Sequence, residues 1–188
     1  MKCIKHIAVF LLCLSLIGCS TCQREPQARQ ELDSSVTDLC RWTGMNRDGP
    51  VTAFKRWTTD HPRYSVTAQL NIDGSVRLFT LTFDSSRQVL DFTPEPFDDL
   101  SIMSRGLGSD TVKDHKTRAR CIAAVNKLNQ HLKWTWYGRP AIQKVGSNFL
   151  VTYVTVSPDE SKKRPYLDPF VSFLMTPNGI IFATFFGS

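Results

Sequence analysis

The stretch that decides the fold covers residues 64–83 and reads YSVTAQLNIDGSVRLFTLTF. Apolar and polar residues alternate on both sides of Asp73-Gly74, which is the period of a half-buried strand. Asp-Gly is a strong signal for a two-residue hairpin turn, because both central residues of that turn need a positive φ. The sequence therefore predicts an antiparallel hairpin of strands 64–72 and 75–83, with one apolar and one polar face.

The tight turn also predicts the register of this hairpin. The expected facing pairs are Ile72 with Ser75, Leu70 with Arg77, Ala68 with Phe79 and Val66 with Leu81. Residues 89–92 add a third strand, and the Pro- and Gly-containing segment 94–110 reads as a connector.

The second half of the sequence predicts one long helix followed by strands. Over 111–132 one helical face collects the apolar residues Cys121, Ile122, Val125, Leu128 and Leu132. Thr111 and Asp114 resemble a capping box at its start. Strand-like segments follow at 133–137 and 141–145, which the sequence leaves continuous or separate, and at 148–157, 169–176 and 180–186. Asn178-Gly179 repeats the hairpin signal.

This order of elements, a long helix and then an antiparallel meander, resembles the cystatin-like and NTF2-like α+β families. The resemblance covers about residues 111–186 and implies a sheet that curls around the helix. Aligning the two hairpins by their turns places Val66 with Val171 and Gly74 with Gly179. An internal duplication is therefore a hypothesis, which hairpin chemistry alone could also explain.

The segment before the first hairpin predicts helices. Residues 20–30 are polar and read as a tether, of at most ~36 Å when extended. Residues 31–43 carry apolar residues at helical spacing, with Gly44 as a stop. Pro50 suits the start of a short second helix, whose buried edge would carry Val51, Phe54 and Trp57. The expected organisation is a signal segment over 1–18, a tether over 19–30, a helix-plus-hairpin region over 31–93, the connector over 94–110, and a helix-plus-sheet region over 111–188.

The N-terminus reads as a secretory signal, with Lys2 and Lys5 before an apolar stretch over 7–17 that is too short to span a bilayer. It ends in Leu16-Ile17-Gly18-Cys19, which resembles the lipobox of bacterial lipoproteins. That resemblance implies that Cys19 carries a thioether-linked diacylglycerol and becomes the first residue after cleavage. Ser20 in the next position resembles the class sorted to the outer membrane facing the periplasm, with the inner membrane and the cell surface left open.

Charge is distributed unevenly along the chain. Residues 20–100 hold 9 Lys and Arg against 12 Asp and Glu, whereas residues 101–188 hold 12 against 5. Such a division fits two subdomains that dock on each other, or a surface for anionic material. Nucleic acid is a poor partner for a protein tethered outside the cytoplasm, so we expect an envelope protein as partner, with anionic headgroups as a further candidate.

Cysteine usage fits an exported protein. Cys22, Cys40 and Cys121 remain beside the acylated Cys19 after cleavage, and an oxidising compartment permits disulfides. Cys40 with Cys121 is the natural pair, although three thiols allow three pairings and the sequence does not choose between them. The alternative is that Cys121 is a small buried apolar residue.

Sequence motifs for catalysis, metals or cofactors are not found. We therefore expect no catalytic residue and no cofactor. Two features predict binding instead. A basic stripe on the predicted helix carries Lys113, Lys116, Arg120 and Lys127, and two aromatics, Trp134 and Trp136, share one face if they lie on a strand. The alternatives are a solvated helix face for the first and packing in the core for the second.

The sequence thus favours a non-catalytic interaction module on a membrane anchor. Two further hypotheses stay open. One is a carrier of a lipid or other small apolar ligand in a pocket between helix and sheet, and the other is an unrecognised enzyme with residues scattered along the chain.

Overall fold

The structure, a computed structural model, describes residues 27–57, 63–96, 111–157 and 170–187. The predicted signal segment, Cys19, Cys22 and most of the expected connector therefore lie outside the described residues. The described residues form two helices and nine strands, which confirms the α+β class. In chain order they are a helix over residues 27–43, β1 (Asn46–Arg47), β2 (Ala53–Trp57), β3 (Arg63–Ile72), β4 (Ser75–Phe83), β5 (Val89–Glu95), α3 (His115–Leu132), β6 (Tyr137–Val145), β7 (Asn148–Val154), β8 (Phe170–Met175) and β9 (Ile181–Gly187).

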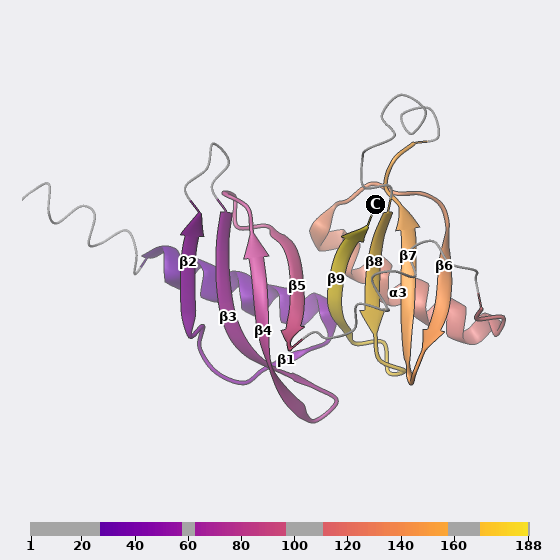
Figure 1. Ribbon diagram of the computed structural model, residues 1–188, viewed down its shortest axis with the longest axis horizontal. Helices are drawn as coiled ribbons and strands as arrows, with labels where there is room; N and C mark the ends of the chain where they lie inside the picture. The colour runs from indigo at the N-terminus through magenta and orange to yellow at the C-terminus, as the bar shows by residue number, and fades with distance from the viewer. Residues whose placement is uncertain (1–26, 58–62, 97–110, 158–169, 188) are drawn as a thin grey trace, which may run out of the picture.

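These elements form two halves that repeat one order, a helix followed by an antiparallel meander (Figure 1). In the first half β2 and the two-residue β1 both pair with β3, and β4 and β5 follow. The second half has the order β6-β7-β8-β9. The predicted helix-plus-meander of the second half is thus present. In the first half the predicted hairpin and third strand are confirmed as β3, β4 and β5, and the unpredicted β2 completes a second meander.

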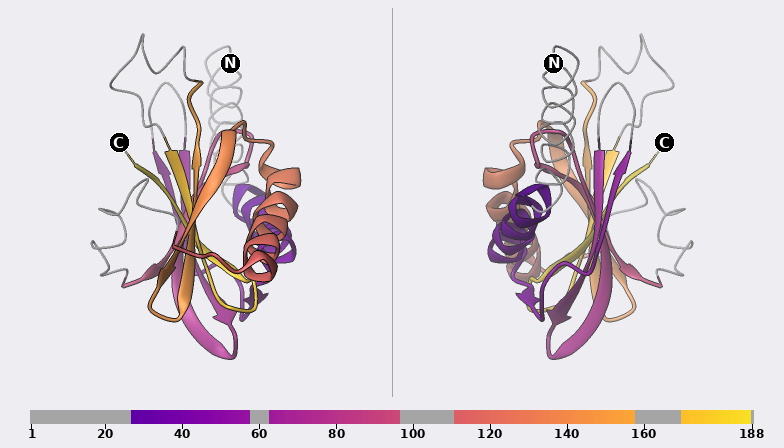
Figure 2. Two further views of the ribbon diagram at one scale, coloured as in Figure 1. Left: turned by 90° about the vertical axis from the view of Figure 1, so that its right-hand side faces the viewer. Right: turned by 90° about the vertical axis from the view of Figure 1, so that its left-hand side faces the viewer.

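The two sheets meet along β5 and β9, which lie side by side and run in opposite directions (Figure 1). The backbone N–H of Phe92 donates to Thr184 Oγ1 across this seam at 3.3 Å. Both helices lie on the same face of the joined sheets (Figure 2). The molecule is therefore two layers deep, with helices on one side and the sheets on the other.

The repeat does not match the alignment of the two hairpin turns. Asp73-Gly74 joins the second and third strands of its meander, β3 and β4, whereas Asn178-Gly179 lies between the third and fourth strands, β8 and β9. When the four meander strands that follow each helix are counted in order, β3 is equivalent to β7, and β4 to β8. Gly74 and Gly179 consequently occupy different places in the two halves, because a turn signal marks a tight connection and not its position in the fold.

The first hairpin forms as the sequence predicts. All four expected pairs are present in the β3–β4 register. Asp73 and Gly74 have φ values of 49° and 87°, which only a primed turn requires. Asn71 Oδ1 accepts a hydrogen bond from the Gly74 N–H at 2.8 Å and so fixes the turn locally.

Apolar side chains fill the layer between the helices and the sheets. Helix 27–43 buries Leu32, Val36 and Leu39 completely, and Gly44 ends it with a φ of 83°. From α3 the buried residues are Cys121, Val125, Leu128 and Leu132. Each such aliphatic side chain contributes roughly 1.5–3 kcal/mol, so the apolar faces hold the helices in place.

Several predicted boundaries were wrong. The helix predicted from Pro50 is strand β2, which pairs with β3 over its full length. The three-residue spacing in that segment was too short to distinguish a helix turn from a strand, and pairing with the long β3 decides it. Residues 27–30, which were assigned to the tether, are helical and continuous with the predicted helix.

The long helix is also shorter than predicted. Asp114 is its N-cap, with a side chain that accepts from the Thr117 N–H at 2.7 Å, so α3 begins at His115. Thr111 instead bonds strand β6. At the other end Lys133 adopts a left-handed conformation with φ 56°, and residues 133–136 are not a strand. The chain enters β6 only at Tyr137, and β6 is continuous through Val145.

Polar and aromatic contacts join the two halves beyond the sheet seam. Trp42 from helix 27–43 stacks on His131 from α3, with ring centroids 5.9 Å apart and planes 17° apart. From the turn between β4 and β5, Gln88 donates to the Leu132 carbonyl at 2.5 Å, while its neighbour Arg87 forms an ion pair with Glu31 inside the first half. The C-terminal ends of both helices are thereby fixed to the middle of the molecule.

Candidate binding surface

Metal chemistry and an activated tyrosine have no support in the part of the chain that the structure describes. Among those residues no group of three or more His, Cys, Asp or Glu is placed to hold a metal ion. Burial raises the pKa of Tyr153 to about 12, so its hydroxyl stays protonated at neutral pH. Neither observation supplies a base or a nucleophile.

The predicted disulfide between Cys40 and Cys121 is not formed, because both are buried free thiols on different helices. Helical spacing put each on an apolar face, but that pattern could not say whether the two faces meet. Burial raises the pKa of Cys40 to about 11, against a weaker opposing effect of Arg47, and burial also raises the pKa of Cys121. Both thiols are therefore protonated and unreactive at neutral pH.

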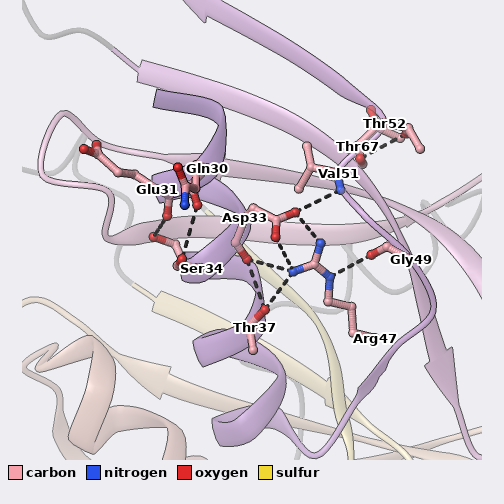
Figure 3. A network of polar contacts seen from close by, with 11 residues as sticks. Gln30, Glu31, Asp33, Ser34, Thr37, Arg47, Gly49, Val51, Thr52 and Thr67 are labelled. Atoms are coloured by element: carbon pink, nitrogen blue, oxygen red, sulfur yellow. Dashed lines mark hydrogen bonds and ion pairs between the residues drawn. The ribbon is translucent and has the colours of Figure 1, made fainter. Parts of the chain in front are cut away.

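The densest polar network secures helix 27–43 to the chain that leads into β2 (Figure 3). Arg47 forms an ion pair with Asp33 and donates to Thr37 Oγ1 and to the Gly49 carbonyl, each at 2.7 Å. Asp33 also accepts from the Val51 N–H at 3.2 Å. The hydrogen bond from Arg47 is the main reason why the pKa of Asp33 is lowered. Each charge is satisfied within the network, which makes it a structural clamp.

The sequence-predicted basic stripe lies on the solvent side of α3. Lys116, Arg120 and Lys127 are exposed, and Lys113 is exposed just before the N-cap. The ion pairs Arg41–Asp38, Arg47–Asp33 and Arg87–Glu31 join other residues of the described chain and do not include Lys116, Arg120 or Lys127. We call these four residues the α3 basic face. The side chains of Lys116, Arg120 and Lys127 are exposed along one side of the helix, where they can meet a partner.

The two tryptophans are not part of this face. Trp136 stacks on Tyr153 with ring centroids 4.3 Å apart, and Trp134 lies 6.1 Å from Phe173. Both are half-buried and pack against the core. They follow the C-terminal end of α3, whereas Lys113 precedes its N-terminal end, and the 18-residue helix between them is about 27 Å long. The tryptophan rings pack against the core and the basic side chains are exposed to solvent, so the two candidates do not form one surface.

Beside the basic face, a groove runs between α3 and β6. Its walls come from His115, Arg118, Ala119, Ile122, Ala123 and Asn126 on the helix, and from Arg139 and Pro140 on the strand. Val112, Lys113 and Ala141 continue it past the helix start. Sequence reasoning missed this groove. The available signal was Arg118, which the helical wheel places beside the apolar face, where an arginine needs an interacting partner.

Arg118 spans the base of the groove. Its guanidinium donates to the Val112 carbonyl at 3.1 Å and to the Pro140 carbonyl at 3.4 Å. The side chain thereby links α3 to the outer edge of β6. Arg118 is therefore a structural part of the groove, whereas Arg139, which precedes Pro140 on β6, is exposed.

The outer edge of β6 is already occupied. The N–H groups of Thr111 and Val112 both donate to the Ile142 carbonyl, at 3.0 and 3.1 Å. Thr111 Oγ1 in turn accepts from the Lys144 N–H at 3.1 Å. An occupied edge does not offer the row of free backbone groups that strand addition requires. Side chains, and not the sheet edge, form the available surface at this end.

Comparison of the chain with protein-family models, with curated proteins and with solved structures finds no match. Neither of the two described helices combines the length and the apolar character needed to cross a membrane. The candidate surface therefore rests on the geometry and charge of this chain alone.

Proposed function

We propose that this protein is a lipid-anchored envelope lipoprotein whose α+β body binds an acidic partner protein through the α3 basic face. The anchor is the lipid on Cys19, and the sequence that directs its attachment is the lipobox Leu16-Ile17-Gly18-Cys19. Two or more acyl chains hold a protein on a membrane far more stably than one. With Ser20 after Cys19, we place the anchor in the outer membrane, facing the periplasm.

The observation that carries the binding role is the concentration of exposed positive charge along one side of α3. Lys116, Arg120 and Lys127 are exposed on the helix and Lys113 is exposed just before it, within a half of the chain where basic residues outnumber acidic ones by 12 to 5. Exposed charges of one sign attract and orient a partner of the opposite sign. An acidic protein in the envelope is the partner that fits this surface.

The finer assignment of the fold belongs to the same proposal. One helix on a four-stranded antiparallel meander is the arrangement of cystatin-like and NTF2-like domains, and both halves of the chain have that order. We propose that the second half is a unit of this kind. Such folds host binding modules, but the fold alone does not choose a function, so the assignment adds support only together with the surface.

Packing under α3 disfavours the alternative of a small-ligand carrier. In the described core the space between α3 and its sheet is filled by side chains that are at most 1% exposed, among them Cys121, Val125, Leu128 and Leu132. A carrier of an apolar ligand needs an enclosed apolar cavity at such a place. The open surface of the same helix is the better site.

The anchor is tested by Cys19→Ala in the full chain expressed with its own signal segment. We expect metabolic labelling with an alkyne fatty acid to mark the wild type and not the variant, and the variant to lose the diacylglycerol mass. Cys22→Ala is the matched control and should keep the label. A wild-type protein that takes up no fatty acid would contradict the anchor.

The binding role is tested by reversing the charge of the α3 basic face with Lys116→Glu, Arg120→Glu and Lys127→Glu together. Each exposed pair is worth about 0.2–1 kcal/mol, so a reversal of three should weaken a complex by about tenfold or more. The measurement is the yield of a specific crosslinked complex in intact envelopes. Arg29→Glu, Arg41→Glu and Arg77→Glu make the same charge change in the first half, and this control should retain the complex.

A further inference from the structure

The groove between α3 and β6 combines two kinds of surface. Ala119, Ile122 and Ala123 on α3 face Pro140 on β6 and give it an apolar floor. Positive charge rims it, from Lys113 at one end and Arg139 along the strand. None of the residues that line it is acidic. An occupant needs apolar side chains for the floor and negative charge for the rim.

We propose that this groove receives an acidic amphipathic segment of the partner protein. The inference rests on the proposed function and extends it, because it names the part of the surface that gives the complex its specificity. The neighbouring α3 basic face attracts the partner, and the groove holds one apolar row of it. The groove is continuous with that face, since Lys113 belongs to both.

The state of the β6 edge favours side-chain docking over strand addition. Thr111 and Val112 occupy the Ile142 carbonyl, and Arg118 occupies that of Pro140, which itself has no N–H. A partner cannot extend the sheet at these positions. An amphipathic segment that places apolar side chains at intervals of three or four residues is the recognition mode that a groove beside a helix offers.

The position of the groove favours a protein over the anchoring membrane. The chain that leads from Cys19 enters the described body at residue 27, at one end of its long axis, whereas β6 and the start of α3 lie at the other end (Figure 1). Eight residues reach at most about 29 Å. The lipid therefore holds the entry end within that distance of the bilayer, and the groove lies at the end of the body farthest from the attachment (Figure 1).

The test places the photo-crosslinking residue p-benzoylphenylalanine, one position at a time, in the full anchored protein in intact envelopes. Position 123 replaces an exposed alanine of the groove, and position 127 replaces a lysine of the α3 basic face. Position 76 replaces Val76, which is 48% exposed on β4 and serves as a control. Mass spectrometry then identifies the peptide or lipid attached at each position.

We expect position 123 to attach to a protein segment with more Asp and Glu than Lys and Arg, and with apolar residues spaced by three or four. Arg139→Glu should lower the yield of that adduct by about threefold, as expected for turning one exposed rim attraction into a repulsion. Arg77→Glu should leave it unchanged. Both arginines are exposed, and the amount of folded protein in the envelope is measured in parallel.

The remaining outcomes separate this inference from the proposed function. A protein adduct at position 127 without one at 123 would overturn the groove and leave the proposed function standing. Adducts with lipid alone at position 123 would overturn the choice of a protein as occupant. Equal adducts at positions 76 and 123 would show unspecific contact and also overturn it. No protein adduct at either 123 or 127 would overturn the groove and the proposed function together.

Discussion

The two halves share an order of elements but differ in the sheet face that the helices leave uncovered. In the first half this outer face is polar and half-exposed, with Thr67, Thr80 and Thr93 in one row across β3, β4 and β5. In the second half it is buried and largely apolar. Its residues include Leu150, Phe170, Leu174, Ala183 and Phe185, all below 9% exposed.

The difference teaches that one topology can carry two kinds of sheet. The first sheet has one apolar face, as antiparallel sheets often do, and its strands alternate in sequence. Strands β7 and β8 are buried on both faces and read as nearly continuous apolar runs. Neither helix lies over the outer face of the second sheet (Figure 2), so its burial is not a product of the helix layer.

Charge replacement on equivalent strands should produce the largest contrast between the halves. Leu78 on β4 and Leu174 on β8 both point to the outer face, but they are 36% and 3% exposed. We expect Leu174→Asp to destabilise the protein by about 4 kcal/mol, because it buries an unpaired carboxylate. Leu78→Asp should cost less than about 0.5 kcal/mol. Urea unfolding of the two variants makes the measurement, and similar losses would mean that the outer faces do not differ.

An intermediate effect should come from the arginines that fix each helix to its sheet. Arg47 pairs with a carboxylate, Asp33, whereas Arg118 donates to the backbone carbonyls of Val112 and Pro140. We expect Arg47→Met to cost about 2 kcal/mol, because it leaves a partly buried carboxylate without its partner, and Arg118→Met about 1 kcal/mol.

The two variants should also differ in their response to acid. The pKa of Asp33 is below its usual 3.8 in the folded protein, so its stabilisation is present above that pH and is lost as the pH falls through the folded pKa. Arg47→Met should therefore reduce the acid-induced loss of stability below pH 4. Arg118→Met should leave that loss as large as in the wild type. Urea unfolding between pH 5 and pH 2.5 checks this, and equal acid sensitivity in both variants would contradict the clamp.

The smallest effect should appear at the stack between the halves. Burial lowers the pKa of His131 from 6.5, against an opposing attraction from Asp38 and with a further lowering by Lys133. The folded state therefore prefers the neutral ring, so stability is full above pH 6.5 and declines as the pH falls toward the folded pKa. We expect wild-type Tm to fall more than that of His131→Gln between pH 7.5 and 5.5. A parallel fall in both proteins would exclude a role of this histidine.

The sequence predicted the features that depend on neighbouring residues, and it failed for those that depend on contacts with distant segments. The β3–β4 register followed from alternation and from Asp73-Gly74, because turn geometry and strand period act within a few residues. Strand β2 was mistaken for a helix, since its assignment depends on pairing with β3. Trp134 and Trp136 looked like a strand, but the left-handed Lys133 turns the chain and sends both rings to Tyr153 and Phe173.

The candidate site was predictable only in part. The cations of the α3 basic face came from helical spacing alone, because 100° per residue fixes which side chains share a side. The groove beside it could not be found in this way, since Arg139 and Pro140 come from a strand that returns past the helix. The wrong prediction of a Cys40–Cys121 bridge has a related cause, because helical spacing does not tell whether the faces of two helices meet.

The sequence by itself determined the anchor signal as a hypothesis, the α+β class, the first hairpin and the basic side of α3. These depend on patterns that repeat over two to four residues, and local geometry converts such patterns directly into structure. Tertiary structure alone decided that β5 meets β9, that both helices share one face, and that the second sheet is buried on both sides. Those outcomes depend on which distant surfaces exclude water together, and no local period records that choice.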